Sequence, residues 1–383
     1  YPESMRESYI RLLYKKGTYS SKGLAEGQYD NAPNNPRKLS NWRPIALICC
    51  DSKILSAYIA GWLKHIITRI VPNTQSAFVP GRSIHDTIML IQQLIQRHNV
   101  EDIPGGLLFI DFAHAYDYIS QEYILAMLET MRFPPVFIKA IKMTMANQIG
   151  RVIVNQDLSP SFEINNGGRQ GDPLFPLIYI LALVGLSALI ETHPEFKGIQ
   201  SPDPEIRITH VGYADDTVML LDPHNNDHIH IEDILNTFVK ASGNEIKIAK
   251  SFVMWLGTES RQDLKVYNIN AIPKDQVERY LGLNIAQKGN ILLNWDKPLN
   301  SMPQQIAHWS TMGLSAFGRT LLINAGLLSK LWFLAMQIPA TQSIIKRINE
   351  QVNRYFRKSR RCNSIKVEKR LTPAWMGGLG QLE

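Results

Sequence analysis

The chain has 383 residues, a formal net charge of +7, and 45% hydrophobic against 20% charged residues. This is the composition of an ordinary soluble globular protein, and the length exceeds what one hydrophobic core supports, so two or three subdomains are expected. The basic balance favours a polyanionic partner over a neutral or cationic one.

The cysteines and the start of the chain indicate its compartment. Cys49, Cys50 and Cys362 form no Cys-X-X-Cys pair and no zinc ligand set with the histidines, which indicates thiols in a reducing compartment. No basic-then-apolar leader opens the sequence, so we expect no signal peptide and an intracellular protein. The chain starts at Tyr1 and not at a methionine, so we expect it to be part of a longer polypeptide.

The first segment, residues 1–39, is polar, with a centre rich in Gly, Ser, Asn and Pro. This pattern predicts a loop or poorly ordered arm with little core. Residues 41–47 form a strand-like apolar run that contains Arg43, and residues 52–70 have a helical pattern with Lys53 at its start.

A second helix is predicted after Arg82. Ser83 and Asp86 make a capping pair, and the following isoleucines recur on one helical face. Arg82 therefore precedes a helix N-terminus, whose free N–H groups favour phosphate. The alternative is an ordinary surface arginine at a turn.

Residues 107–112 form a short, continuous apolar run that carries Asp111 near its end. A lone carboxylate late in a buried strand costs free energy unless it is paired or bound to metal. This favours a functional role for Asp111.

A glycine-rich turn at residues 167–173 leads into the apolar run 174–190. We expect Asp172 to be the helix N-cap, and Gln170 offers both a donor and an acceptor to a ligand. The alternative is that the same residues simply make a turn. The apolar run is nearly long enough to span a bilayer, but Pro176 and the lack of an anchor favour a buried core helix.

Tyr213-Ala214-Asp215-Asp216 lies between two apolar, strand-like runs. The pattern predicts a β-hairpin with two carboxylates at its tip. Adjacent aspartates repel each other, and a divalent cation suits oxygen ligands. The alternative is a solvated Asp-rich turn. Together with Asp111, these residues match the ligand set of a two-metal phosphoryl-transfer site.

The C-terminal part alternates between helix and strand patterns. A helix is expected at 231–242, strands at 252–256 and 280–285, and helices from residue 302 onward. The last helix has a basic face, which is either merely solvated or binds a phosphate backbone. That face holds Lys346, Arg347, Arg354, Arg357 and Lys358.

Three blocks of the sequence resemble motifs A, B and C of reverse transcriptases. They read LFIDFAHAYD (108–117), GRQGDPLFPL (168–177) and YADDTV (213–218). Further blocks resemble the non-LTR (LINE-type) retrotransposon polymerases: NWRPIAL (41–47), QSAFVPGRS (75–83), YLGL (280–283) and a thumb segment at 308–337. The blocks occur in the family's order, which makes the resemblance far more specific than any single motif.

The resemblance implies an α+β fold, a right-hand polymerase with fingers, a palm of antiparallel sheet with helices on one face, and a helical thumb. It implies an N-terminal arm and fingers at 1–106, and a palm at 107–290 with a fingers excursion around 130–166. A helical thumb would follow at 291–360, and 361–383 would begin a C-terminal connection.

The implied activity is that of an RNA-directed DNA polymerase, a nucleotidyltransferase that adds a dNTP to a primer 3′-hydroxyl on an RNA or DNA template. The implied cofactor is a pair of Mg²⁺ ions, with Mn²⁺ as a substitute. The implied partners are an RNA template and a DNA primer, in a nuclear or cytoplasmic ribonucleoprotein and without a membrane.

The resemblance also assigns roles to single residues. Asp111 and Asp215 would bind both metal ions, with Asp216 beside them. Tyr116 would be the aromatic gate that crowds a ribose 2′-hydroxyl, and Gln170 would contact the sugar of the incoming nucleotide. Candidates for the triphosphate are Arg82, Arg43 and Lys53, and Lys250 matches a lysine that would protonate pyrophosphate.

Three positions depart from the family pattern. His114 stands where lysine is common, Phe175 where serine is common, and Ala113 where a charged residue is common. These departures remove no metal ligand, but they keep open the alternative of a catalytically inert nucleic-acid-binding remnant. An RNA-templated RNA polymerase would share the palm chemistry, and Tyr116 together with the motif order argues against it.

Overall fold

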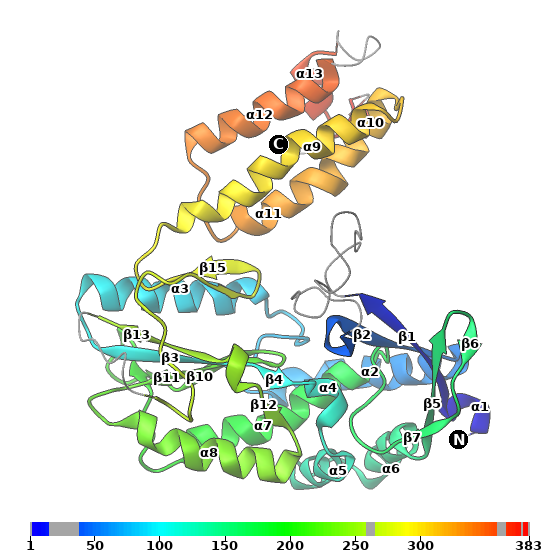
Figure 1. The fold of residues 1–383 in the computed structure, drawn as a ribbon, viewed down its shortest axis with the longest axis vertical. Helices are drawn as coiled ribbons and strands as arrows, with labels where there is room; N and C mark the ends of the chain where they lie inside the picture. Colours follow the sequence, from blue (N-terminus) through cyan, green and yellow to red (C-terminus); the bar gives the residue numbers. More distant parts are fainter. Residues whose placement is uncertain (1, 15–37, 258–264, 358–364, 377, 382–383) are drawn as a thin grey trace, which may run out of the picture. The chain divides into compact units, whose positions relative to one another are not determined.

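The computed structural model describes residues 2–14, 38–257, 265–357, 365–376 and 378–381. The chain divides into two compact units, whose elements are drawn in Figure 1. The first comprises Tyr1–Thr87 and Arg97–Ile272, and the second comprises Ile88–Gln96 and Pro273–Glu383.

The first unit contains a four-stranded antiparallel sheet in the order β10-β11-β3-β13. Its strands are β3 (Gly105–Ile110), β10 (His210–Tyr213), β11 (Asp216–Leu221) and β13 (Phe252–Leu256). Every residue of β3 is buried, as its continuous apolar sequence predicts. Phe109 of β3 stacks on Phe252 of β13, with ring centroids 4.4 Å apart.

Helices α7 (Phe175–Thr192) and α8 (Asp227–Ser242) lie along one face of this sheet (Figure 1), and α5 (Gln121–Thr130) packs on both. Within the described residues, α7 alone is long and apolar enough to cross a membrane. Most of its side chains are buried in the hydrophobic core, which confirms the predicted core helix.

The start of α7 differs from the prediction. The helix begins at Phe175 with Leu174 as its N-cap, so Asp172 is not the capping residue. Asp172 instead accepts hydrogen bonds from Leu174 N–H at 2.9 Å and from the Ser56 hydroxyl at 3.1 Å. This carboxylate therefore ties the turn before α7 to α2 (Cys50–Ile70).

The predicted capping pair is confirmed, since Ser83 and Asp86 form the capping box of α3 (Ile84–Val100). The Ser120 side chain caps α5. Gly243 ends α8 with φ of +72°, a conformation that glycine adopts without a steric penalty.

A second sheet of five strands contains β1 (Glu7–Tyr14), β2 (Trp42–Ile48), β5 (Gln148–Val154), β6 (Asp157–Leu158) and β7 (Phe162–Ile164). Strand β1 runs antiparallel to β2 and parallel to β5. The expectation of an irregular segment through residue 39 is therefore wrong for residues 2–14. Both neighbours of β1 come from distant parts of the sequence, so no local pattern reveals the pairing. The remainder of the predicted arm, residues 15–37, lies outside the described residues.

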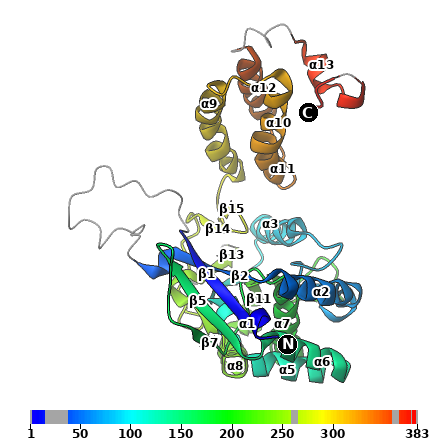
Figure 2. The same cartoon turned by 90° about the vertical axis from the view of Figure 1, so that its right-hand side faces the viewer.

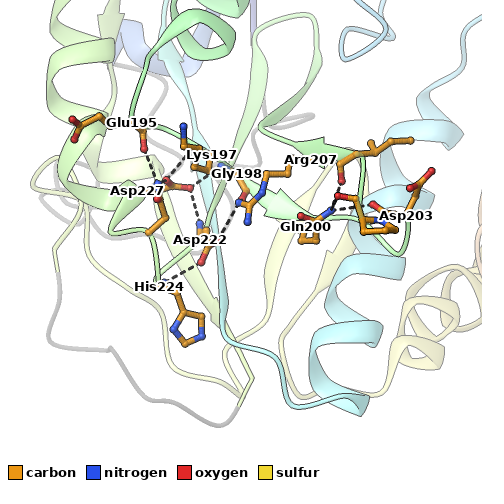
Figure 3. Close-up of polar contacts among 12 residues, drawn as sticks. Glu195, Lys197, Gly198, Gln200, Asp203, Arg207, Asp222, His224 and Asp227 are labelled. Atoms are coloured by element: carbon orange, nitrogen blue, oxygen red, sulfur yellow. Dashed lines mark hydrogen bonds and ion pairs between the residues drawn. The ribbon is translucent and has the colours of Figure 1, made fainter.

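The polar contacts in Figure 3 join the hairpin of β8 (Ile199–Gln200) and β9 (Arg207–Ile208) to the start of α8. The fully buried Asp227 carboxylate accepts hydrogen bonds from the N–H groups of Lys197 and Gly198, at 3.0 and 2.8 Å. The remaining elements of the first unit are α1 (Glu3–Arg6), η1 (Leu39–Asn41), β4 (Phe112–Ala113), α4 (Ala115–Tyr118), α6 (Pro135–Met145), β12 (Glu245–Ile246) and η2 (Ile248–Lys250).

The second unit contains a small hairpin and a helical bundle. The single strand predicted at 280–285 is in fact β14 (Glu278–Tyr280) and β15 (Leu283–Ile285), because positive φ angles at Leu281 and Gly282 reverse the chain. Figure 2 shows the bundle. Its elements are η3 (Ile291–Trp295), α9 (Asp296–Ser310), α10 (Ala316–Leu322), the π-helical η4 (Ile323–Leu328), α11 (Ser329–Ala335) and α12 (Gln342–Arg357), followed by α13 (Val367–Leu371) and η5 (Ala374–Met376).

Polar contacts hold the hairpin and the bundle together. The Asn294 side chain hydrogen-bonds both N–H and C=O of Asn284, at 2.7 and 3.0 Å, and so joins β15 to η3. The C-terminal segment of the second unit begins at Pro273, ahead of the boundary at 290 that the resemblance implies between palm and thumb. The division by function into fingers, palm and thumb stays a prediction.

Candidate active site

Asp111 lies directly after β3. Its backbone N–H donates to Ser251 Oγ at 3.0 Å, and its carbonyl accepts from Lys247 N–H at 2.8 Å. Because Ile110 pairs with Thr217, Asp111 emerges at the same end of the sheet as the start of β11. The strand register therefore brings Asp111 to the hairpin that carries the other two aspartates.

The predicted hairpin at Tyr213–Asp216 is confirmed. Tyr213 and Asp216 are paired in the ladder between β10 and β11, and Ala214 and Asp215 form the two-residue turn. Ala214 has φ of +55°, which is uncommon for a residue other than glycine. The turn therefore has a conformation that the surrounding structure must support.

The electrostatics of the three carboxylates favour a nearby cation. Burial, followed by the charge of Asp111, raises the pKa of Asp215, while Arg43 and Lys250 act in the opposite direction. Burial and then Asp215 and Asp111 raise the pKa of Asp216 to about 7. A cation among these groups would offset both the burial and the mutual repulsion.

Asp111 and Asp215 line one cavity of about 540 Å³, whereas Asp216 is not among its lining residues. Within the described residues, no three or more His, Cys, Asp or Glu side chains are grouped closely enough to hold a metal ion. Mg²⁺ nevertheless needs only one or two protein carboxylates, because it retains water and binds substrate phosphates. The pair Asp111 and Asp215 fits that requirement.

The cavity wall combines acidic, basic and aromatic side chains. Lys250 Nζ lies 3.5 Å from Asp111 Oδ2, and both side chains are partly exposed. Such a wall suits a ligand that carries both phosphates and a flat base or sugar. Besides the two aspartates, the wall includes Arg43, His114, Tyr116, Asp117, Gln170, Lys247 and Lys250.

Tyr116 lies on α4, and its ring packs against aromatic residues of α7. Its ring stacks on Tyr179 with centroids 4.7 Å apart, and Phe175 lies one helical turn before Tyr179 with its ring 5.9 Å from Tyr116. Burial, followed by the charge of Asp215, raises the pKa of Tyr116 above its ordinary value. Tyr116 is therefore a neutral, well-supported side chain beside the carboxylates at physiological pH.

Gln170 is oriented by Asp117, a residue to which sequence reasoning gave no role. The Gln170 amide nitrogen lies 3.1 Å from each of the two Asp117 carboxylate oxygens. The backbone carbonyl of Gln170 accepts a hydrogen bond from Ala46 N–H at 2.9 Å, and this contact fixes the turn against β2. Asp117 therefore leaves the amide oxygen of Gln170 available to a hydrogen-bond donor.

Comparison with known proteins decides the family. The sequence matches the family described as reverse transcriptase (RNA-dependent DNA polymerase) over residues 32–285. The chain belongs to this family.

Two curated relatives come from transposable elements. A Xenopus laevis protein, the transposon TX1 uncharacterized 149 kDa protein, is 26% identical over 92% of this chain and 26% of its own length. The Retrovirus-related Pol polyprotein from type-2 retrotransposable element R2DM of Drosophila melanogaster is 22% identical over 67% of this chain and 25% of its own length. The chain thus spans about a quarter of the length of either relative. These matches confirm the predicted resemblance to non-LTR retrotransposon reverse transcriptases.

A solved structure, apo telomerase from Candida tropicalis truncated from the C-terminal domain, superposes with a TM-score of 0.47 at 10% identity. The superposed region covers 74% of this chain and 54% of the telomerase chain. The α+β fold class that the sequence predicts is confirmed. The evidence is the antiparallel sheet with α7 and α8 on one face, together with the family match.

The structure separates the basic residues predicted to bind the triphosphate. Arg43, on β2, lines the cavity, whereas Lys53 is exposed in the first turn of α2 and is not among the lining residues. Arg82 does not line the cavity either. Its guanidinium donates to the backbone carbonyls of Val71 and Gln75, at 2.9 and 2.7 Å. The triphosphate role of Arg82 remains a prediction that this geometry does not favour.

The basic residues predicted to bind nucleic acid lie on α12 in the second unit. Lys346, Arg347, Arg354 and Arg357 are exposed, as a backbone-binding face requires, and Lys358 lies outside the described residues. Val352 and Phe356 of the same helix are buried, whereas Ile345 is 39% exposed.

The sequence does not reveal the role of Gln75 either. Gln75 is the first residue of the QSAFVPGRS motif, and its buried side chain hydrogen-bonds the hairpin turn at Ala214. The one available signal was a glutamine next to an apolar run, which has no specific structural meaning by itself.

Proposed function

We propose that this chain is an active RNA-directed DNA polymerase that joins a dNTP to a primer 3′-hydroxyl on an RNA or DNA template. Membership of the reverse transcriptase family supports the reaction class. The observation that carries the proposal is that Asp111 and Asp215 line one cavity together with Tyr116 and Gln170.

In this proposal Asp111, Asp215 and Asp216 hold two Mg²⁺ ions. The bound ions supply positive charge to the phosphate oxygens and favour the deprotonated primer hydroxyl. The raised pKa values of Asp215 and Asp216 support the assignment, because buried carboxylates that repel one another gain most from a cation.

The other cavity residues act on the nucleotide. Arg43 and Lys250 supply positive charge for the triphosphate, and Lys250 is also the candidate donor of a proton to pyrophosphate. Tyr116 excludes a ribose 2′-hydroxyl by occupying its space, and Gln170 accepts a hydrogen bond through its amide oxygen while its amide nitrogen donates to Asp117. The exposed basic residues of α12 bind the nucleic-acid backbone.

Primer extension on an RNA template tests the metal site. We expect Asp215→Asn to lower single-nucleotide incorporation at least roughly a hundredfold, because contacts to catalytic metal ions contribute several kcal/mol. Asp233→Asn is the matched control, since that side chain is 80% exposed on α8. Equal rates for wild type and Asp215→Asn would exclude the assigned site. Salt-dependent RNA binding by a wild-type chain that incorporates nothing would instead support the inert remnant.

Ribonucleotide discrimination tests the gate. We expect Tyr116→Ala to lower the preference for dNTP over rNTP by roughly ten- to a hundredfold, because the space beside the 2′ position opens. Tyr58→Ala, at a residue 63% exposed on α2, is the control. An unchanged preference in Tyr116→Ala would remove Tyr116 from this role.

A further inference from the structure

The turn that carries Asp215 is held by a residue outside the hairpin. Gln75 Oε1 accepts a hydrogen bond from Ala214 N–H at 2.9 Å, and Gln75 Nε2 donates to the Ala214 carbonyl at 3.3 Å. The same Oε1 accepts from Ala77 N–H at 3.0 Å, so its position is fixed from a second side. One buried side chain therefore binds both polar groups of the residue that precedes Asp215.

The backbone around Gln75 extends the sheet beside β10. Gly212 N–H donates to the Thr74 carbonyl at 2.7 Å, and Ser76 N–H donates to the Gly212 carbonyl at 3.0 Å. Gln75 thus forms a parallel bridge with Gly212. A Cβ at Gly212 would lie 2.9 Å from Gln75 Nε2, so a side chain at this position would displace the amide that reaches the turn.

Arg82 fixes the segment that carries Gln75. Besides the carbonyls of Val71 and Gln75, its guanidinium donates to the Pro72 carbonyl and, at 3.1 Å, to Asn73 Oδ1. These contacts use the planar donor fork that arginine has and lysine lacks. Contacts therefore run from Arg82 through residues 71–75 to Ala214.

The turn needs this support because Ala214 has a positive φ, which a residue with a Cβ adopts only when its surroundings enforce it. We propose that Arg82 and Gln75 are positioning residues that hold the hairpin turn in the conformation that presents Asp215 to the cavity. Neither side chain lines the cavity, so both act through the turn. The consequence for DNA synthesis rests on the proposed function, whereas the support of the turn does not.

Hydrogen exchange at the hairpin tests the support without any catalytic readout. Gln75→Met keeps the length of the side chain and removes its hydrogen bonds. We expect exchange of the Ala214 amide to become at least about tenfold faster, because that amide loses its acceptor. Gln200→Leu is the matched control, since Gln200 also donates through its amide to backbone carbonyls, in the β8–β9 loop shown in Figure 3. Exchange in Gln75→Met within twofold of wild type would overturn the proposal.

A second variant covers the case in which Gln75→Met does not fold. Gly212→Ala leaves Gln75 intact and pushes its amide away from the turn, so it should also speed exchange at Ala214. In a Gln75→Ala background the added methyl has space, and the same substitution should then have no further effect. Additive effects of the two substitutions would contradict contact between them.

Steady-state kinetics of nucleotide incorporation distinguish a positioning role of Arg82 from a role in binding the triphosphate. We expect Arg82→Lys and Gln75→Met to lower kcat about ten- to a hundredfold with the KM for dNTP within about twofold, because a displaced carboxylate affects the reacting geometry. A raised KM for dNTP in Arg82→Lys, with unchanged exchange at Ala214, would overturn the positioning role. If wild type incorporates nothing while exchange behaves as expected, the proposed function fails and the support of the turn stands.

Discussion

Acidification should destabilise the first unit through one buried histidine. His210, the first residue of β10, is 3% exposed, and its Nε2 lies 2.9 Å from Ser187 Oγ and 3.0 Å from Thr74 Oγ1. Its Nδ1 lies 3.1 Å from the Thr209 hydroxyl. Burial lowers the pKa of His210 to about 4, because the charged ring would lose its hydration.

The sign and size of the effect follow from linkage. An unfolded histidine has a pKa of about 6.5, so between about pH 6.5 and 4 the unfolded chain binds a proton that the folded chain does not. The free energy of unfolding therefore falls as the pH falls through this window. Between pH 7 and pH 5 the loss attributable to His210 is roughly 2 kcal/mol.

Urea unfolding at pH 7 and pH 5 measures this loss, with His210→Gln as the reference. Glutamine keeps an uncharged polar group near the Ser187 and Thr74 hydroxyls but does not titrate. All other groups titrate in both proteins, so the difference between the two pH dependences isolates His210. Equal loss of stability in wild type and His210→Gln would refute the reasoning.

Two further predictions concern packing and nucleic-acid binding. Gly168→Ala should lower the free energy of unfolding by roughly 1–3 kcal/mol, because the added Cβ would overlap the buried Phe175 ring. In a Phe175→Ser background, measured by thermal denaturation, Gly168→Ala should cost less than it does in the wild type, because the ring is gone. An equal cost of Gly168→Ala with and without the Phe175 ring would show that the ring is not the obstacle. The double variant Arg354→Gln, Arg357→Gln should bind nucleic acid with a weaker salt dependence. We expect the slope of the log of the binding constant against the log of the salt concentration to fall by about 2, because each arginine neutralises about one phosphate. An unchanged slope in a filter-binding titration would remove α12 from the nucleic-acid surface.

The sequence by itself determined the local elements and the chemistry of the candidate site. The tetrapeptide at Tyr213–Asp216 and the Ser83 capping pair encode hydrogen bonds between near neighbours, and the continuous apolar run before Asp111 encodes the burial of its strand. Periodicity and turn chemistry report such contacts directly. The order of the motifs then supplied the family, which the match over residues 32–285 confirms.

Only the tertiary structure decided which side chains meet. Gln75 and Ala214 are 139 positions apart, and no local pattern records that an amide will bind that peptide. The sequence placed Arg82 before a helix N-terminus and so predicted phosphate binding. In the fold its guanidinium donates to the backbone carbonyls of Val71 and Gln75, which no local pattern records, and the phosphate role stays a prediction. Strand β1 similarly depends on partners from distant segments. The raised pKa values of Asp215 and Asp216 have the same origin, because burial and the approach of Asp111 exist only once the sheet has formed.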